Sequence, residues 1–155
     1  MRCLLDPCTF PWSVAGAKDL SPAASQIFAN LANEVFLRAV SLWELSVKYA
    51  LGKLPLPGTF DCFVVEERER HGIAALPLNE PAVLHLHTLP LLHRDPFDHM
   101  LICQAIEHGC VLLTPDPLIA QYPVRKRWYV CTSACSVSTG TQGYDFCVFR
   151  RAHSV

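Results

Sequence analysis

Short apolar segments alternate with longer segments of helical character along most of this chain. The expected strands are residues 2–5, 34–40, 73–78, 110–114 and 124–130, and the expected helices are residues 20–33, 41–52, 59–72, 79–92, 95–109 and 116–122. Strands that alternate with helices favour a mainly parallel sheet with helices on both faces. The sequence therefore predicts an α/β fold, and the charges of the last strand place it at an edge of the sheet.

Two of the expected helices begin with a typical capping residue. Ser21 precedes Pro22, and Asp95 precedes Pro96, so each pair offers a side chain for the N-cap and a proline for the first helical position. The helix expected at 41–52 has an apolar face that includes Trp43, which we expect to lie in the core.

Composition excludes several classes of protein. The mean hydropathy is +0.23, yet no apolar run approaches the roughly 18 residues of a membrane span. Asp6 interrupts the apolar start of the chain, so a secretory signal is not predicted. The net charge of −1 gives no general attraction to nucleic acid, so contact with a polyanion would need a local patch or a bridging metal ion.

The eight cysteines do not form a disulfide or zinc pattern. Cys3, Cys103 and Cys110 fall within apolar segments, where free thiols pack as small apolar side chains. We therefore expect reduced thiols and a cytoplasmic location.

Four acidic residues follow or approach strand ends in the predicted layout. Asp6 ends the first strand, Glu44 lies one turn into the helix after the second, and Asp116 follows the strand at 110–114. Asp98 begins a helix and can join them if that helix starts at the same edge. In a parallel sheet these ends border one crevice, where ligands bind.

Each of these acids also has a purely structural interpretation. "SLWE" (41–44) fits a capping box, "DPFD" (95–98) places acids at an N-cap and at the third helical position, and Asp-Pro is a common helix start. Capping does not require that the helix ends converge, whereas several carboxylates in one crevice repel unless a cation neutralises them. Hard oxygen ligands suit Mg²⁺ or Mn²⁺, and such a site supports phosphodiester hydrolysis.

Four motifs resemble one known family. "LLDPCTFPW", "VSLWELSVKYALGKLPLPG", "HRDPFDHMLICQA" and "LLTPDPLIAQYPV" are similar, in this order, to the PIN-domain ribonucleases, in particular VapC-type toxins of bacterial type II toxin–antitoxin pairs. The resemblance covers about residues 1–128. It implies a PIN-like, Rossmann-like three-layer α/β/α fold with a mainly parallel sheet. It also implies Mg²⁺- or Mn²⁺-dependent endoribonuclease activity on RNA, a homodimer, inhibition by a small antitoxin protein, and no membrane association.

The resemblance also assigns roles to particular residues. Asp6, Glu44, Asp98 and Asp116 match the four acids of the family and are the expected catalytic and metal-binding residues. The supporting residues are expected to be Asp95, Thr9 and Thr114. The apolar helices at 20–33 and 41–70 are candidate surfaces for the dimer or the antitoxin.

The chain departs from the family pattern near two of the acids. Pro7 and Cys8 follow Asp6 where the family usually has a hydroxyl residue and often histidine, Pro11 stands where leucine is expected, and Pro115 precedes Asp116. These departures leave open a second hypothesis, a catalytically impaired PIN module that still dimerises and binds an antitoxin. A third hypothesis, phosphoryl transfer to an aspartate, lacks the second acid that a phosphatase of that kind needs at position 8.

The chain therefore divides into a PIN domain at 1–130 and an atypical tail at 131–155. The tail is rich in Ser, Thr, Gly and Cys, has no counterpart in the family, and is predicted to be poorly ordered. Its composition suggests an altered reading frame.

Overall fold

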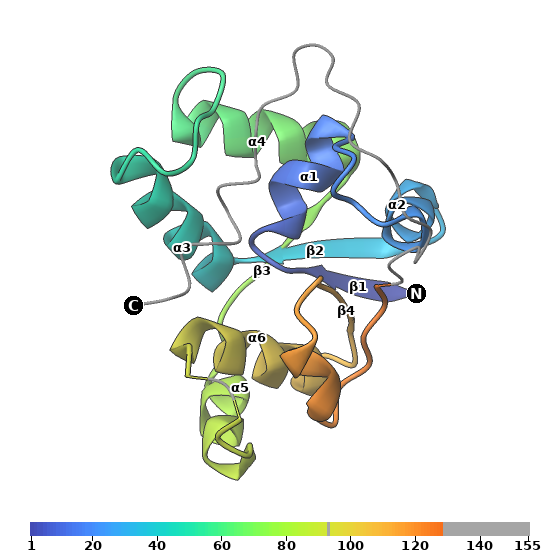
Figure 1. The fold of residues 1–155 in the computed structure, drawn as a ribbon, viewed down its shortest axis with the longest axis vertical. Helices are drawn as coiled ribbons and strands as arrows, with labels where there is room; N and C mark the ends of the chain where they lie inside the picture. Colours follow the sequence, from blue (N-terminus) through green and yellow to red (C-terminus); the bar gives the residue numbers. More distant parts are fainter. Residues whose placement is uncertain (93, 129–155) are drawn as a thin grey trace, which may run out of the picture.

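A parallel sheet forms the centre of the molecule, with helices on both of its faces (Figure 1). The structure, a computed structural model, describes residues 1–92 and 94–128. Within these residues the strands are β1 (Arg2–Leu5), β2 (Glu34–Arg38), β3 (Ala74–Leu76) and β4 (Val111–Leu113), in the order β3-β2-β1-β4. The expected α/β class with three layers is confirmed.

The helices form two groups around the sheet. Their bounds are α1 (Thr9–Ala15), α2 (Pro22–Ala29), α3 (Ala39–Ala50), α4 (Phe60–His71), α5 (Glu80–His85) and α6 (Pro96–Glu107), with 3₁₀ turns η1 (Leu86–Thr88) and η2 (Leu118–Gln121). In Figure 1, α1 and α4 lie above the sheet, and α5 and α6 lie below it.

Two apolar cores lie on opposite faces of the sheet. Along β1, Cys3 and Leu5 join one core, whereas Leu4 joins the other. This alternation is the two-residue period of a strand. All three side chains are fully buried, so β1 is a central strand that fixes both helical layers.

The carboxyl ends of the central strands lie side by side. Leu5 of β1 pairs with Leu113 of β4, and the next residue, Asp6, donates its backbone N–H to the Leu113 carbonyl at 3.2 Å. The chain therefore enters its loops at one edge of the sheet, where ligands bind in parallel α/β folds.

The predicted helix starts at 21 and 95 are confirmed. The Ser21 side chain accepts a hydrogen bond from Ala24 N at 3.2 Å, and Asp95 Oδ1 accepts one from Phe97 N at 2.8 Å. The capping box at "SLWE" is wrong, because α3 begins at Ala39 and Ser41 lies inside it.

Several element predictions need correction. Helix α1 was not expected; its Pro11 occupies the first turn, where a missing N–H costs little, and Phe10 is buried beside it. The described part of the predicted strand 124–130 forms a single β-bridge, between Lys126 and Leu112. Its charged side chains offer little apolar surface to bury. Residues 129–130 lie outside the described residues. The helix expected at 79–92 is shorter in the structure. It consists of α5 followed by the 3₁₀ turn η1, which ends at Thr88.

The exposed side of α3 is a further correction. Trp43 of α3 is 62% exposed and Leu51, which follows the helix, is 64% exposed, whereas Glu44 is buried. The apolar face that carries Trp43 therefore does not enter the core, and the fully buried Leu45 of the same helix packs into it instead. The face that turns inward is partly polar, because it borders the cavity described below.

The cysteines of the described residues are free thiols, as expected: Cys3, Cys8, Cys62, Cys103 and Cys110. Across these same residues, none of the helices has the length and apolar character that a membrane span requires. The predicted tail at 131–155 lies outside the described residues.

Candidate acidic site

All four predicted acids line one cavity of about 470 Å³ at the carboxyl edge of the sheet. Its lining consists of Asp6, Pro7, Cys8, Trp12, Glu44, Lys48, Asp98, Pro115, Asp116 and Pro117. The acids come from four different segments: the ends of β1 and β4, the inner side of α3 and the first turn of α6. The fold thus brings together carboxylates that are far apart in the sequence.

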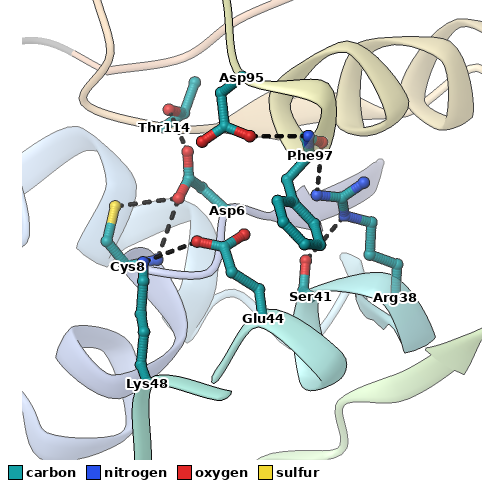
Figure 2. A network of polar contacts seen from close by, with 9 residues as sticks. All are labelled: Asp6, Cys8, Arg38, Ser41, Glu44, Lys48, Asp95, Phe97 and Thr114. Carbon is teal, nitrogen blue, oxygen red and sulfur yellow. Dashed lines mark hydrogen bonds and ion pairs between the residues drawn. The ribbon is translucent and has the colours of Figure 1, made fainter. Parts of the chain in front are cut away.

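The Asp6 carboxylate is held by three protein donors (Figure 2). Its Oδ1 accepts hydrogen bonds from the Cys8 backbone N–H at 3.0 Å and the Cys8 thiol at 2.9 Å. Its Oδ2 accepts a hydrogen bond from Thr114 Oγ1 at 2.6 Å. Because Asp6 and Thr114 are both buried, these bonds fix the carboxylate in one orientation.

Glu44 and Asp116 are held by different partners. Lys48 Nζ lies 2.7 Å from Glu44 Oε1, one helical turn away, and both side chains are largely buried. Asp116 Oδ1 accepts a hydrogen bond from Leu118 N at 2.8 Å, and its backbone carbonyl accepts one from Lys126 Nζ.

Asp98 enters the cavity from the start of α6. Asp95 caps this helix, and Asp98 is the third helical residue and buried. The N-terminus of a helix stabilises negative charge, since its N–H groups point outward. In the "DPFD" motif, Asp95 therefore caps the helix and Asp98 lines the cavity, so the structural and the functional interpretation both apply.

The predicted supporting residues differ in position. Thr114 bonds directly to Asp6, whereas Thr9 donates its hydroxyl to the Leu113 carbonyl at 2.8 Å. Thr9 therefore holds the start of α1 against β4, and its hydroxyl is used there. Asp95 is the helix cap.

The departures from the family pattern are accommodated locally. The Cys8 thiol, at the position where the family often has histidine, donates a hydrogen bond to Asp6 Oδ1. The proline at position 115 removes one N–H, but the neighbouring Asp116 N still donates to Thr114 Oγ1 at 3.2 Å.

Three cations of the site were missed from the sequence. Lys48 pairs with Glu44, Lys126 reaches the backbone of Asp116, and Arg38 lies fully buried at the end of β2. A signal was present in "VFLR", where an arginine ends an otherwise apolar, buried strand. Arginine is seldom buried without anionic partners.

Burial shifts the pKa of several groups at the site. Burial raises the pKa of the Cys8 thiol well above its ordinary value, and the adjacent Asp6 carboxylate raises it further. Burial lowers the pKa of Lys126, while Asp116 and then Asp6 oppose that shift. Cys8 is therefore a neutral donor at neutral pH, consistent with its bond to Asp6.

The donor set fits a hard divalent cation in its chemistry. Four carboxylates border one cavity, and carboxylate oxygens are the ligands that Mg²⁺ and Mn²⁺ prefer. Among residues 1–92 and 94–128, no three His, Cys, Asp or Glu side chains are grouped closely enough to hold a metal ion. Occupancy would therefore require some carboxylates to turn from their protein donors toward the cavity.

A family model agrees with this architecture. The model of the PIN domain matches residues 13–124, which include Glu44, Asp98 and Asp116. The chain belongs to the PIN-domain family. The membership expected from the four motifs is confirmed.

One relative of this PIN domain is a ribonuclease of the VapC type. Ribonuclease VapC16 of Mycobacterium tuberculosis is 32% identical over 72 residues, which are 46% of this chain and 48% of that protein. The chain thus spans about half the length of the curated relative it matches. The expected similarity to VapC proteins is confirmed.

Solved structures share the fold. VapBC2 from Rickettsia felis bound to a promoter DNA fragment aligns with a TM-score of 0.63 at 14% identity, covering 82% of this chain and 98% of that one. VapBC-1 from nontypeable Haemophilus influenzae aligns with a TM-score of 0.54 at 16% identity, covering 82% and 97%. At these identities the likeness establishes the fold alone.

Proposed function

We propose that this PIN domain is a Mg²⁺- or Mn²⁺-dependent endoribonuclease and the toxin of a type II toxin–antitoxin pair. The observation that carries the proposal is the meeting of Asp6, Glu44, Asp98 and Asp116 on one cavity. Capping does not explain Glu44, which lies inside α3, and it gives no reason for all four acids to line one cavity.

The four carboxylates are the proposed metal-binding and catalytic residues. When bound, a divalent cation supplies positive charge for the scissile phosphate and favours deprotonation of the attacking water. Thr114 and Cys8 hold both oxygens of Asp6 in place. Asp98 lies at a helix N-terminus, which lowers the cost of holding a buried carboxylate there.

The proposed substrate is RNA, and the cation makes an acidic cavity compatible with it. The chain carries a net charge of −1, so no general basic surface draws in the phosphate backbone. A cation in the cavity offsets the repulsion between the carboxylates and the scissile phosphate.

The proposed protein partners are a small antitoxin and a second copy of this chain. The Rickettsia felis and Haemophilus influenzae structures are VapBC assemblies, which supports an antitoxin partner. The exposed apolar side of α3, with Trp43, Val47 and Leu51, is a suitable contact surface. A cytoplasmic location follows from this role.

The direct test is cleavage of structured RNA by the purified protein with Mn²⁺, with and without chelator, beside Asp98→Asn. We expect cleavage by the wild type that chelator abolishes, and loss of cleavage in the variant. Glu66→Gln is the matched control, because Glu66 is exposed on α4. Chelator-insensitive cleavage, or full activity in Asp98→Asn, would refute the proposed mechanism.

A second candidate is an impaired module that keeps partner binding. It is favoured by the protein donors that already occupy Asp6 and by the Lys48 pair with Glu44. Folded protein that cleaves no RNA with Mn²⁺, yet captures a small partner when the two are coexpressed, would favour this candidate.

A further inference from the structure

A buried arginine stands behind the carboxylates of the acidic site. Arg38 is the last residue of β2 and the N-cap of α3, and its side chain is 0% exposed. It does not line the cavity. An arginine without solvent needs anionic or hydrogen-bonding partners, because burying an unpaired charge is strongly unfavourable.

The guanidinium joins the two helices that carry Glu44 and Asp98 (Figure 2). Its Nε donates to Ser41 Oγ of α3 at 2.8 Å, and its Nη2 donates to the Phe97 carbonyl of α6 at 2.8 Å. Ser41 lies three residues before Glu44, and Phe97 immediately precedes Asp98. The arginine therefore spans the gap between the first turns of α3 and α6.

Hydrogen bonds alone do not account for the burial of this charge. Nη1 of Arg38 is buried and has no hydrogen-bond partner among the described residues. Burial lowers the pKa of Arg38 to about 10, against the opposing influence of Glu44, Asp6, Asp98 and Asp95. The side chain is thus charged at neutral pH, and the surrounding carboxylates offset part of the cost of burying it.

We propose that Arg38 is the resident counter-cation and positioning residue of the carboxylate cluster. It bridges α3 and α6 so that Glu44 and Asp98 keep their places, and its charge reduces the repulsion among the acids when the cavity holds no divalent ion. The same charge opposes the entry of a second cation. The part concerning divalent ions rests on the proposed function, whereas the part concerning repulsion does not.

Two opposite consequences distinguish this role from ordinary packing. Removal of the charge destabilises the metal-free protein, because buried carboxylates lose their compensation. It also tightens the binding of a divalent cation, since an unfavourable interaction between like charges disappears. An arginine that only filled space would produce the first effect without the second.

The first experiment is a double-mutant cycle in excess chelator with Arg38→Met and Asp98→Asn, measured by urea denaturation. We expect Arg38→Met to lower the folding equilibrium constant at least about tenfold more in the wild-type background than in the Asp98→Asn background. Equal losses in both backgrounds overturn the inference. If Arg38→Met does not fold alone, recovery of folding in the double variant supports the inference, and failure of the double variant while Asp98→Asn folds overturns it.

The second experiment is a calorimetric titration of the folded variants with Mn²⁺. We expect Arg38→Met or Arg38→Gln to bind about tenfold more tightly than wild type, and Arg38→Lys, which keeps the charge, to bind like wild type. Arg68→Gln is the matched control, because Arg68, like Arg38, donates to a backbone carbonyl, but that carbonyl belongs to Ile73 and not to a helix that carries one of the four acids. Equal affinity in Arg38→Met and wild type overturns the inference. If no variant binds Mn²⁺, the proposed function fails, and the cycle alone decides the role of Arg38.

Discussion

The two sides of α3 differ in a way that bears on function. The inward side carries Ser41, Glu44 and Lys48, which engage in polar contacts around the cavity. The outward side carries Trp43 and Leu51, both mostly exposed. A helix whose only task is packing buries apolar side chains on its inward side. Here the inward side combines the fully buried Leu45 with these polar residues. The helix therefore serves both the core and a polar site on one side and leaves an apolar surface for contact on the other.

The largest effect is expected for a substitution on the inward side of α3. Glu44→Gln removes one carboxylate from the cavity and the ion pair between Glu44 and Lys48. We expect the rate of metal-dependent RNA cleavage to fall by about 10²-fold or more, because a charge that serves the transition state is lost. Single-turnover cleavage assays measure this, with Glu66→Gln beside it. Unchanged rates would mean that the inward polar side is structural only.

The second prediction tests whether neighbouring side chains orient the Asp6 carboxylate. Thr114→Val removes the hydroxyl that donates to Asp6 Oδ2 at 2.6 Å in a buried setting. We expect a loss of about 1.5–3 kcal/mol in the free energy of unfolding, since a hydrogen bond to a charged group is lost. Thr88→Val is the control, because Thr88 donates at 2.7 Å to the His85 carbonyl on the exposed surface. A loss no larger than that of the control would show that the Asp6 orientation does not depend on Thr114.

The third effect tests the outward side. Val47→Lys combined with Leu51→Lys places two charges on the exposed apolar surface. We expect the dissociation constant of the proposed homodimer to rise at least about tenfold, because a few central apolar residues dominate such contacts. The free energy of unfolding of the monomer should change by less than about 0.5 kcal/mol for each surface substitution. Sedimentation equilibrium measures the dimer, and an unchanged constant would assign the dimer to another surface.

The smallest effect concerns pH. The folded pKa of Cys8 lies well above its ordinary value of 9.0, so the folded state keeps a proton that the unfolded state loses. The stability due to this thiol is complete below pH 9 and declines as the pH rises above it. Between pH 8 and pH 10 the free energy of unfolding should therefore fall by about 1 kcal/mol less in Cys8→Ser than in the wild type. Urea denaturation at the two pH values measures this difference. Identical pH profiles would contradict the raised pKa.

The alternation of elements and the positions of the four acids could be predicted from the sequence. Parallel strands must present their carboxyl ends at one edge, so Asp6 and Asp116 had to meet once β1 and β4 were recognised. The helix starts at Ser21 and Asp95 were likewise predictable, because their side chains cap locally.

The cations and the exposed side of α3 could not be predicted in the same way. The role of Arg38 depends on the Phe97 carbonyl, 59 residues away, and no local pattern carries such a contact. Trp43 was assigned to the core because its spacing matched an apolar face. Periodicity identifies such a face but does not say which side of the helix meets the sheet.

The central claim is that the converging carboxylates hold a divalent cation. Calorimetric titration of Mn²⁺ into the wild type, Asp6→Asn and Glu66→Gln tests it most directly. We expect saturable binding by the wild type and by Glu66→Gln, and binding weakened at least about tenfold in Asp6→Asn. Equal binding by all three proteins would contradict the claim.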